Sequence, residues 1–96
     1  MSTVHFGPVG HRHQRFFIND EEGQIAEMTF VLEDGIMSVD HTLVEKRGEG
    51  KGLAKELLNA MVAYAREHHY KVRPLCPYVE AQFRKNAEQY KDLVAD

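Results

Sequence analysis

Hydrophobic and polar residues alternate along the first half of the chain. Between residues 24 and 33 nearly every second position is apolar, a period of two that predicts a strand with one buried face. The pair Asp34-Gly35 then supplies a tight turn, and residues 36–44 continue the alternation. One face of this second strand is expected to carry Met37, Val39, His41 and Leu43. The two segments therefore predict a β-hairpin.

The spacing of apolar residues changes after Gly52. Apolar positions now recur at 53, 54, 57, 58, 61, 62 and 65, which is one face of a helix running to about His68. A charged loop with two glycines, residues 45–51, precedes this helix. Residues 15–19 and 71–75 are short β-prone segments, and the apolar positions after Pro77 indicate a second, shorter helix.

The order of these elements predicts an α/β (α+β) fold with a mixed sheet. Antiparallel N-terminal strands come first, and a long helix then leads to a strand parallel to its neighbour, followed by the short helix. Residues 1–14 lack periodicity and contain Gly7, Pro8 and Gly10. We therefore expect a flexible leader followed by one domain at residues 15–96.

Composition narrows the classes of function. The formal net charge is -3 and Lys and Arg form no long run, which argues against a nucleic-acid partner. The sequence lacks an apolar stretch of membrane-spanning length and a signal peptide, so we expect a cytoplasmic protein without a membrane partner. One cysteine, Cys76, and scattered histidines offer no metal-binding cluster.

The segment Glu49-Gly50-Lys51-Gly52-Leu53-Ala54 joins a predicted strand to the long helix. Free amides and the positive end of the helix dipole at such a place favour phosphate, and glycines let the backbone approach it. The loop lacks the third glycine of a dinucleotide-binding loop and the Ser or Thr of a Walker loop. Taken alone, it fits a phosphate site and a plain connector equally well.

Cys76 stands immediately before Pro77, and proline favours the first position of a helix. The thiol is therefore expected at the start of the short helix, where the helix dipole stabilises a thiolate and makes Cys76 a candidate nucleophile. A lone cysteine is also commonly a small buried hydrophobe. His41 is a candidate base, although its expected place beside Val39 and Leu43 equally fits a core histidine.

Four segments of the chain follow one another in an order typical of a single family. They are His41-Thr42, residues 50–58 (GKGLAKELL), Tyr64-Ala65-Arg66 and residues 74–79 (PLCPYV). Together they resemble the small single-domain GCN5-related N-acetyltransferases, with similarity from about Arg15 to Val94. The resemblance implies a reduced form of that fold, in which the strand after the long helix splays from its neighbour to admit a pantetheine arm. It also implies acetyl-coenzyme A as co-substrate and no metal.

The resemblance implies roles for individual residues as well. Amides of the glycine loop would hold the pyrophosphate, Leu43 and Val44 would lie along pantetheine, and Cys76 would approach the thioester sulfur. The implied cofactor-binding residues are Leu43, Val44, Glu49, Gly50, Lys51, Gly52, Leu53, Ala54, Cys76, Tyr78, Phe83 and Lys85, and the candidate catalytic residues are Cys76 and His41.

The family's Gln/Arg-x-x-Gly-x-Gly/Ala signature fits this chain in two registers. One uses Arg47, Gly50 and Gly52, and the other uses Glu49, Gly52 and Ala54 with its first residue mismatched. We prefer the second because the helix pattern after it then matches the family. It has the consequence of placing the Glu49 carboxylate beside an anionic phosphate.

The chain is expected to lack the additional N-terminal helices that shape the acceptor site in longer relatives. The acceptor amine, a small molecule or a protein, is therefore open, and the protein is expected to be a monomer or a homodimer. We expect an N-acetyltransferase that passes the acetyl group to an amine directly or through Cys76. The alternative is a module that binds or senses coenzyme A without turnover.

Overall fold

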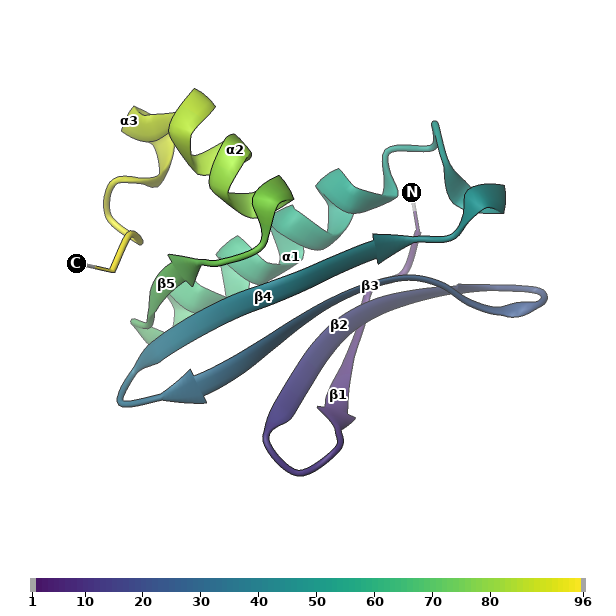
Figure 1. The fold of residues 1–96 in the computed structure, drawn as a ribbon, viewed down its shortest axis with the longest axis horizontal. Helices are drawn as coiled ribbons and strands as arrows, with labels where there is room; N and C mark the ends of the chain where they lie inside the picture. The colour runs from purple at the N-terminus through teal and green to yellow at the C-terminus, as the bar shows by residue number, and fades with distance from the viewer. Residues whose placement is uncertain (1, 96) are drawn as a thin grey trace.

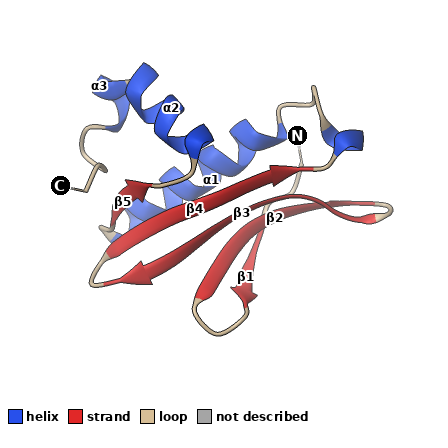
Figure 2. Ribbon diagram, in the orientation of Figure 1, coloured by secondary structure: helices blue, strands red, loops and turns tan. Residues whose placement is uncertain are grey.

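The computed structural model describes residues 2–95, which form a five-stranded mixed sheet and its helices (Figures 1 and 2). The strands lie in chain order across the sheet: β1 (His5–Val9), β2 (His13–Asp20), β3 (Gly23–Glu33), β4 (Ile36–Val44) and β5 (Lys71–Pro74). Neighbouring strands are antiparallel from β1 to β4, and β5 runs parallel to β4. The predicted mixed sheet is therefore confirmed.

Helix α1 (Leu53–His68) packs across β2, β3 and β4. Its apolar stripe provides the centre of the core, where Leu57, Leu58 and Met61 are fully buried against Met28 and Phe30 of β3. The remaining helices are a short 3₁₀ turn η1 (Lys46–Gly48), α2 (Pro77–Lys85) and α3 (Ala87–Tyr90). The parallel pairing of β4 with β5 follows from this crossover helix, because only a long connection lets two consecutive strands run in the same direction.

The prediction of a flexible leader is wrong for residues 5–9. These residues form β1, an edge strand in which Phe6 lies opposite Phe16 of β2. The Phe6 ring stacks on Tyr64 of α1 with centroids 4.9 Å apart, and it still leaves 45% of the residue exposed. The strand is therefore fastened to the sheet by an aromatic cluster formed with distant residues, and the sheet begins before residue 15.

A β-bulge interrupts β4 and reverses its side-chain alternation. Thr29 of β3 pairs with His41 and the next residue, Phe30, pairs with Val39, so Asp40 is an extra residue without a partner in the ladder. After the bulge His41 and Leu43 are exposed, whereas Thr42 and Val44 turn toward the helix side. The predicted face is therefore correct for Met37 and Val39 and wrong for His41 and Leu43.

Strand β5 accompanies β4 over only part of its length. Pairing covers residues 36–39 of β4, and the last contacts are the Leu75 and Cys76 amides, which both donate to the Val39 carbonyl. Residues 40–44 of β4 then continue without a β5 partner, as Figure 1 shows. This is the splay that the resemblance implied. In the part of the chain that the structure describes, no helix is long and apolar enough to cross a membrane.

Candidate functional site

A pocket of about 310 Å³ opens at the N-terminus of α1. Three parts of the fold meet there: the end of β4, the glycine loop with the first turn of α1, and the start of α2. The lining residues are Val44, Gly48, Glu49, Gly50, Gly52, Leu53, Ala54, Lys55 and Tyr78. Most of the sequence-predicted loop therefore lines a single cavity, whereas Lys51 is exposed outside its lining.

The glycine loop has the backbone geometry that an anion site requires. Gly50 and Gly52 have φ values of +79° and +74°, and a Cβ added at either would meet nothing within 4 Å. The first hydrogen bond at the start of α1 runs from the Glu56 amide to the Gly52 carbonyl at 3.2 Å, so the amides of the three residues before Glu56 have no helical partner. No side chain caps this helix end within residues 2–95. These donors are therefore available to a ligand, at the positive end of the helix dipole.

The charges around the loop divide into two groups. Lys55 lines the pocket together with Glu49. Arg47 is used elsewhere, because its Nε donates to Asp20 Oδ2 at 2.8 Å and its Nη2 donates to the Gln24 carbonyl at 3.1 Å. The hydrogen bond from Arg47 holds the pKa of the Asp20 carboxyl at about 2, below its ordinary value of 3.8. Arg47 is absent from the pocket lining, whereas Glu49, Gly52 and Ala54 all belong to it.

Two pocket residues were not identified from the sequence. Gly48 is buried, and a Cβ there would lie 2.9 Å from side-chain atoms of both Ile25 and Leu53, so only glycine fits at this contact. Lys55 follows Ala54 in the first turn of α1 and lines the same pocket as the glycine loop. The available signal was its position three residues after Gly52, in the first turn of the predicted helix.

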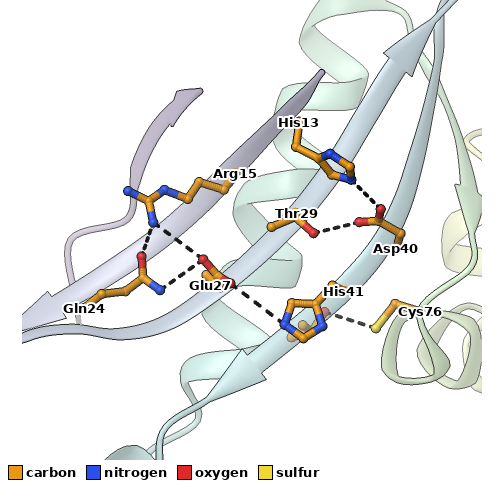
Figure 3. Close-up of polar contacts among 9 residues, drawn as sticks. His13, Arg15, Gln24, Glu27, Thr29, Asp40, His41 and Cys76 are labelled. Carbon is orange, nitrogen blue, oxygen red and sulfur yellow. Dashed lines mark hydrogen bonds and ion pairs between the residues drawn. The ribbon is translucent and has the colours of Figure 1, made fainter. Parts of the chain in front are cut away.

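Cys76 occupies the N-cap position of α2, as predicted, but its side chain is buried. The residue is only 3% exposed, and its Sγ donates to Thr42 Oγ1 at 3.2 Å (Figure 3). Thr42 was not predicted as a site residue, although it belongs to the His41-Thr42 motif. The bulge in β4 turns its side chain toward Cys76.

His41 lies on the opposite side of β4 from Cys76. Its imidazole is 52% exposed, with Nε2 3.9 Å from Glu27 Oε2 of β3 (Figure 3). Because consecutive residues of a strand face opposite sides of the sheet, His41 and Thr42 cannot both point toward the thiol. The structure therefore does not bring the two candidate catalytic residues together.

The residues expected to flank the cofactor are also separated. Tyr78 lines the pocket, and burial raises the pKa of its phenol, with smaller contributions from Tyr90 and Cys76. Phe83 belongs to the core, where it stacks on Tyr90, and Lys85 is exposed at the end of α2. Leu43 is 40% exposed on the far side of the sheet, whereas its neighbour Val44 lines the pocket.

Comparison with known proteins identifies the family. The family model described as GCN5-related N-acetyl-transferase matches residues 15–93. The chain belongs to the GCN5-related N-acetyltransferases. This GCN5-related N-acetyltransferase matches no curated protein. Within residues 2–95 no group of three or more His, Cys, Asp or Glu side chains is arranged to hold a metal ion.

Solved structures similar to this N-acetyltransferase include a GCN5-like protein of the N-acetyltransferase type from Staphylococcus aureus. It is 30% identical, with 99% of this chain and 91% of that chain covered and a TM-score of 0.65. The ribosomal-protein-alanine N-acetyltransferase from Brucella melitensis is 24% identical over 90% of this chain and 64% of its own, with a TM-score of 0.61. The IAA acetyltransferase from Bacillus cereus is 14% identical over 88% and 75%, with a TM-score of 0.66. At these identities the last two proteins show that the fold is shared with this chain.

Proposed function

We propose that the protein binds acetyl-coenzyme A in the pocket at the start of α1 and transfers its acetyl group to an amine. The observation that carries this proposal is the set of unpartnered amides at the helix start, beside the open faces of Gly50 and Gly52. Such a surface suits a pyrophosphate, because several N–H donors and the helix dipole act on the same anion. Lys55 adds a positive charge to the same pocket.

The pantetheine arm is proposed to run from the pocket along β4. Val44 lines the pocket, and residues 40–44 of β4 have no β5 partner, so an extended chain of amides can lie along this free strand edge. Following β4 back from Val44 leads to Thr42 and its partner Cys76. The thioester is therefore proposed to lie near these two residues.

In the transfer the amine nitrogen attacks the thioester carbonyl carbon and forms the new C–N bond. The C–S bond then breaks, coenzyme A leaves as a thiolate, and the proton lost by the amine balances the charge of that leaving group. The burial of Cys76 supports direct attack by the amine, because a thiol that is 3% exposed and hydrogen-bonded to Thr42 is poorly placed to attack first. The route through an acetylated Cys76 is the alternative that the test must separate.

The experiment combines calorimetric titration with coenzyme A, intact mass spectrometry after mixing with acetyl-coenzyme A, and thiol release in the presence of amines. The amines are polyamines, arylamines and peptides with free N-termini or lysines. Binding with amine-dependent thiol release and no protein adduct is the expected result. A gain of one acetyl group that disappears in Cys76→Ser would show the covalent route instead. The serine variant is a matched control because its hydroxyl keeps a donor to Thr42.

Two results would overturn the proposal. Absence of coenzyme A binding would remove the assignment of the pocket. Binding without any thiol release above the buffer blank, across the whole amine panel, would support the second candidate, a module that binds or senses coenzyme A. Two observations favour that candidate. Among residues 2–95, Glu49 is the one carboxylate that lines the pocket, and no histidine lines it. The candidate base His41 is exposed on the other side of the sheet.

A further inference from the structure

We propose that Asp40 is a positioning residue that holds the β4 bulge in place and thereby turns Thr42 and Val44 toward the acetyl-coenzyme A site. This inference rests on the proposed function, because it concerns how the pantetheine arm is received. Asp40 is exposed on the side of the sheet away from α1, and it is not among the residues that line the pocket. It acts only through the backbone of its own strand.

The Asp40 carboxylate of β4 contacts side chains of both β2 and β3 (Figure 3). Its Oδ1 accepts a hydrogen bond from Thr29 Oγ1 of β3 at 2.7 Å, and its Oδ2 lies 2.7 Å from His13 Nε2 of β2. Thr29 is only 8% exposed, and it is the residue that pairs with His41 directly after the bulge. Each carboxylate oxygen is therefore held by a side chain of another strand, one from the neighbouring β3 and one from β2 beyond it. We call these three residues, His13, Thr29 and Asp40, the bulge clamp.

The bulge decides which side chains of β4 face the ligand. Side chains alternate with a period of two, so a strand without the extra residue would send His41 and Leu43 to the helix side and Thr42 and Val44 to the outside. In the structure Val44 lines the pocket and Thr42 accepts the hydrogen bond from Cys76. Aspartate is disfavoured in strands, and the clamp contacts give a physical reason for its presence at this position.

The clamp is separable from the hydrophobic core. Met37 and Val39 precede the bulge, and both are fully buried with the side chains that α1 covers. A change of register after Val39 leaves these two residues in place and exchanges only positions 41–44. Loss of the clamp is therefore expected to alter the ligand-facing end of β4 while the core and the glycine loop keep their structure.

Two ligands allow binding at the nucleotide end of the proposed site to be measured separately from binding at the pantetheine end. Coenzyme A carries the pantetheine arm, and 3′-phosphoadenosine 5′-diphosphate is the same molecule without it. In Asp40→Ala we expect coenzyme A to bind about tenfold more weakly, the value of one lost apolar contact of valine size. We expect the fragment to bind within about twofold of the wild type, because the loop is unchanged. Asp40→Asn should restore most of the affinity, since its amide oxygen still accepts from Thr29.

The single cysteine supplies a second readout that needs no ligand. Cys76 is protected by burial and by its contact with Thr42, so its rate of alkylation reports on the orientation of that residue. Asp40→Ala should be alkylated about tenfold faster than the wild type, as expected when a buried thiol loses its partner. Glu33→Ala is the control, because Glu33 also makes an ion pair on the sheet, to Arg12 of the turn between β1 and β2 at 3.2 Å, but lies away from the bulge.

Each outcome decides the inference. Wild-type affinity for coenzyme A together with slow alkylation in Asp40→Ala would overturn it, and so would equal effects in Glu33→Ala. If Asp40→Ala does not fold, Thr29→Val takes its place, because it removes one clamp hydrogen bond at nearly constant volume and should show the same selective loss. If the wild type binds neither ligand, the proposed function fails, and the alkylation rates alone still decide whether the clamp orients Thr42.

Discussion

Replacing Gly52 with alanine should weaken coenzyme A binding far more than it weakens the fold. Gly52 caps the start of α1 with φ at +74°, and Gly35, in the turn between β3 and β4, has φ at +76°. At both positions an added Cβ meets nothing within 4 Å, so the cost of alanine is the left-handed backbone alone. That cost is about 1–2 kcal/mol at each site. Gly35→Ala is therefore a control matched in strain and free of the pocket.

The two variants are expected to differ in ligand affinity. Gly52 lines the pocket, and its new methyl group would project into space that the pyrophosphate needs to approach the amides of Leu53 and Ala54. A hydrogen bond to a charged group contributes about 1.5–3 kcal/mol. Loss of one such bond lowers the affinity roughly 10- to 150-fold. Gly35→Ala should bind coenzyme A like the wild type.

The assay pairs thermal unfolding with calorimetric titration of coenzyme A. Both variants should lose a similar amount in Tm, about 4–8 °C for each kcal/mol in a domain of this size. The titrations belong at a temperature well below both transitions, so that folding does not limit binding. The reasoning is refuted if Gly52→Ala keeps wild-type affinity, or if both variants lose affinity equally.

Two further predictions concern stability. The Tyr90 hydroxyl is buried without a hydrogen-bond partner among residues 2–95, while the Tyr90 ring stacks on Phe83. Tyr90→Phe should therefore raise the free energy of unfolding, measured by urea denaturation, by about 1–2 kcal/mol. A less stable variant would contradict this. Asp20, with its pKa held at about 2 by Arg47 against an ordinary 3.8, stabilises the fold above pH 3.8 and loses that contribution as the pH falls toward 2. The stability advantage of the wild type over Asp20→Asn, measured in urea at pH 6 and pH 2, should therefore shrink at the lower pH, and an unchanged difference would argue against the ion pair.

The hairpin and the long helix were predictable from local periodicity, and the parallel fifth strand was predictable because a crossover helix precedes it. The bulge was not predictable in the same way. Positions 41 and 43 hold a polar and an apolar residue, His41 and Leu43, and positions 42 and 44 also hold a polar and an apolar residue. Both phases of the strand therefore look alike in sequence, and the contacts that distinguish them, such as those of Asp40 with β2 and β3, come from residues far away in the chain.

Long-range contacts also explain the strand at residues 5–9, which the sequence did not predict. Residues 5–9 include Gly7 and Pro8, which weaken a strand signal, and the strand is held instead by the packing of Phe6 on Tyr64, 58 positions away in the chain. The preferred signature register rested on the local helix pattern, whereas the pairing of Arg47 with Asp20, 27 positions away, has no local signal. The loop itself was predictable, since glycines at a helix start have a local conformational reason.

How well each part of the proposed site could be predicted depends on whether its residues are close together in the sequence. The pyrophosphate end of the proposed site comes mostly from one segment, residues 48–55, with Val44 and Tyr78 added, so most of its lining residues lie close together in the sequence. The thioester end requires β4 with its bulge, a clamp from β2 and β3, and the start of α2 that carries Cys76. Affinity for the nucleotide part should therefore tolerate changes in the sheet, whereas placement of the reacting group depends on the register of three strands. In this chain of 96 residues the same sheet serves both purposes, because it packs against the core and its bulge orients the last residues of β4.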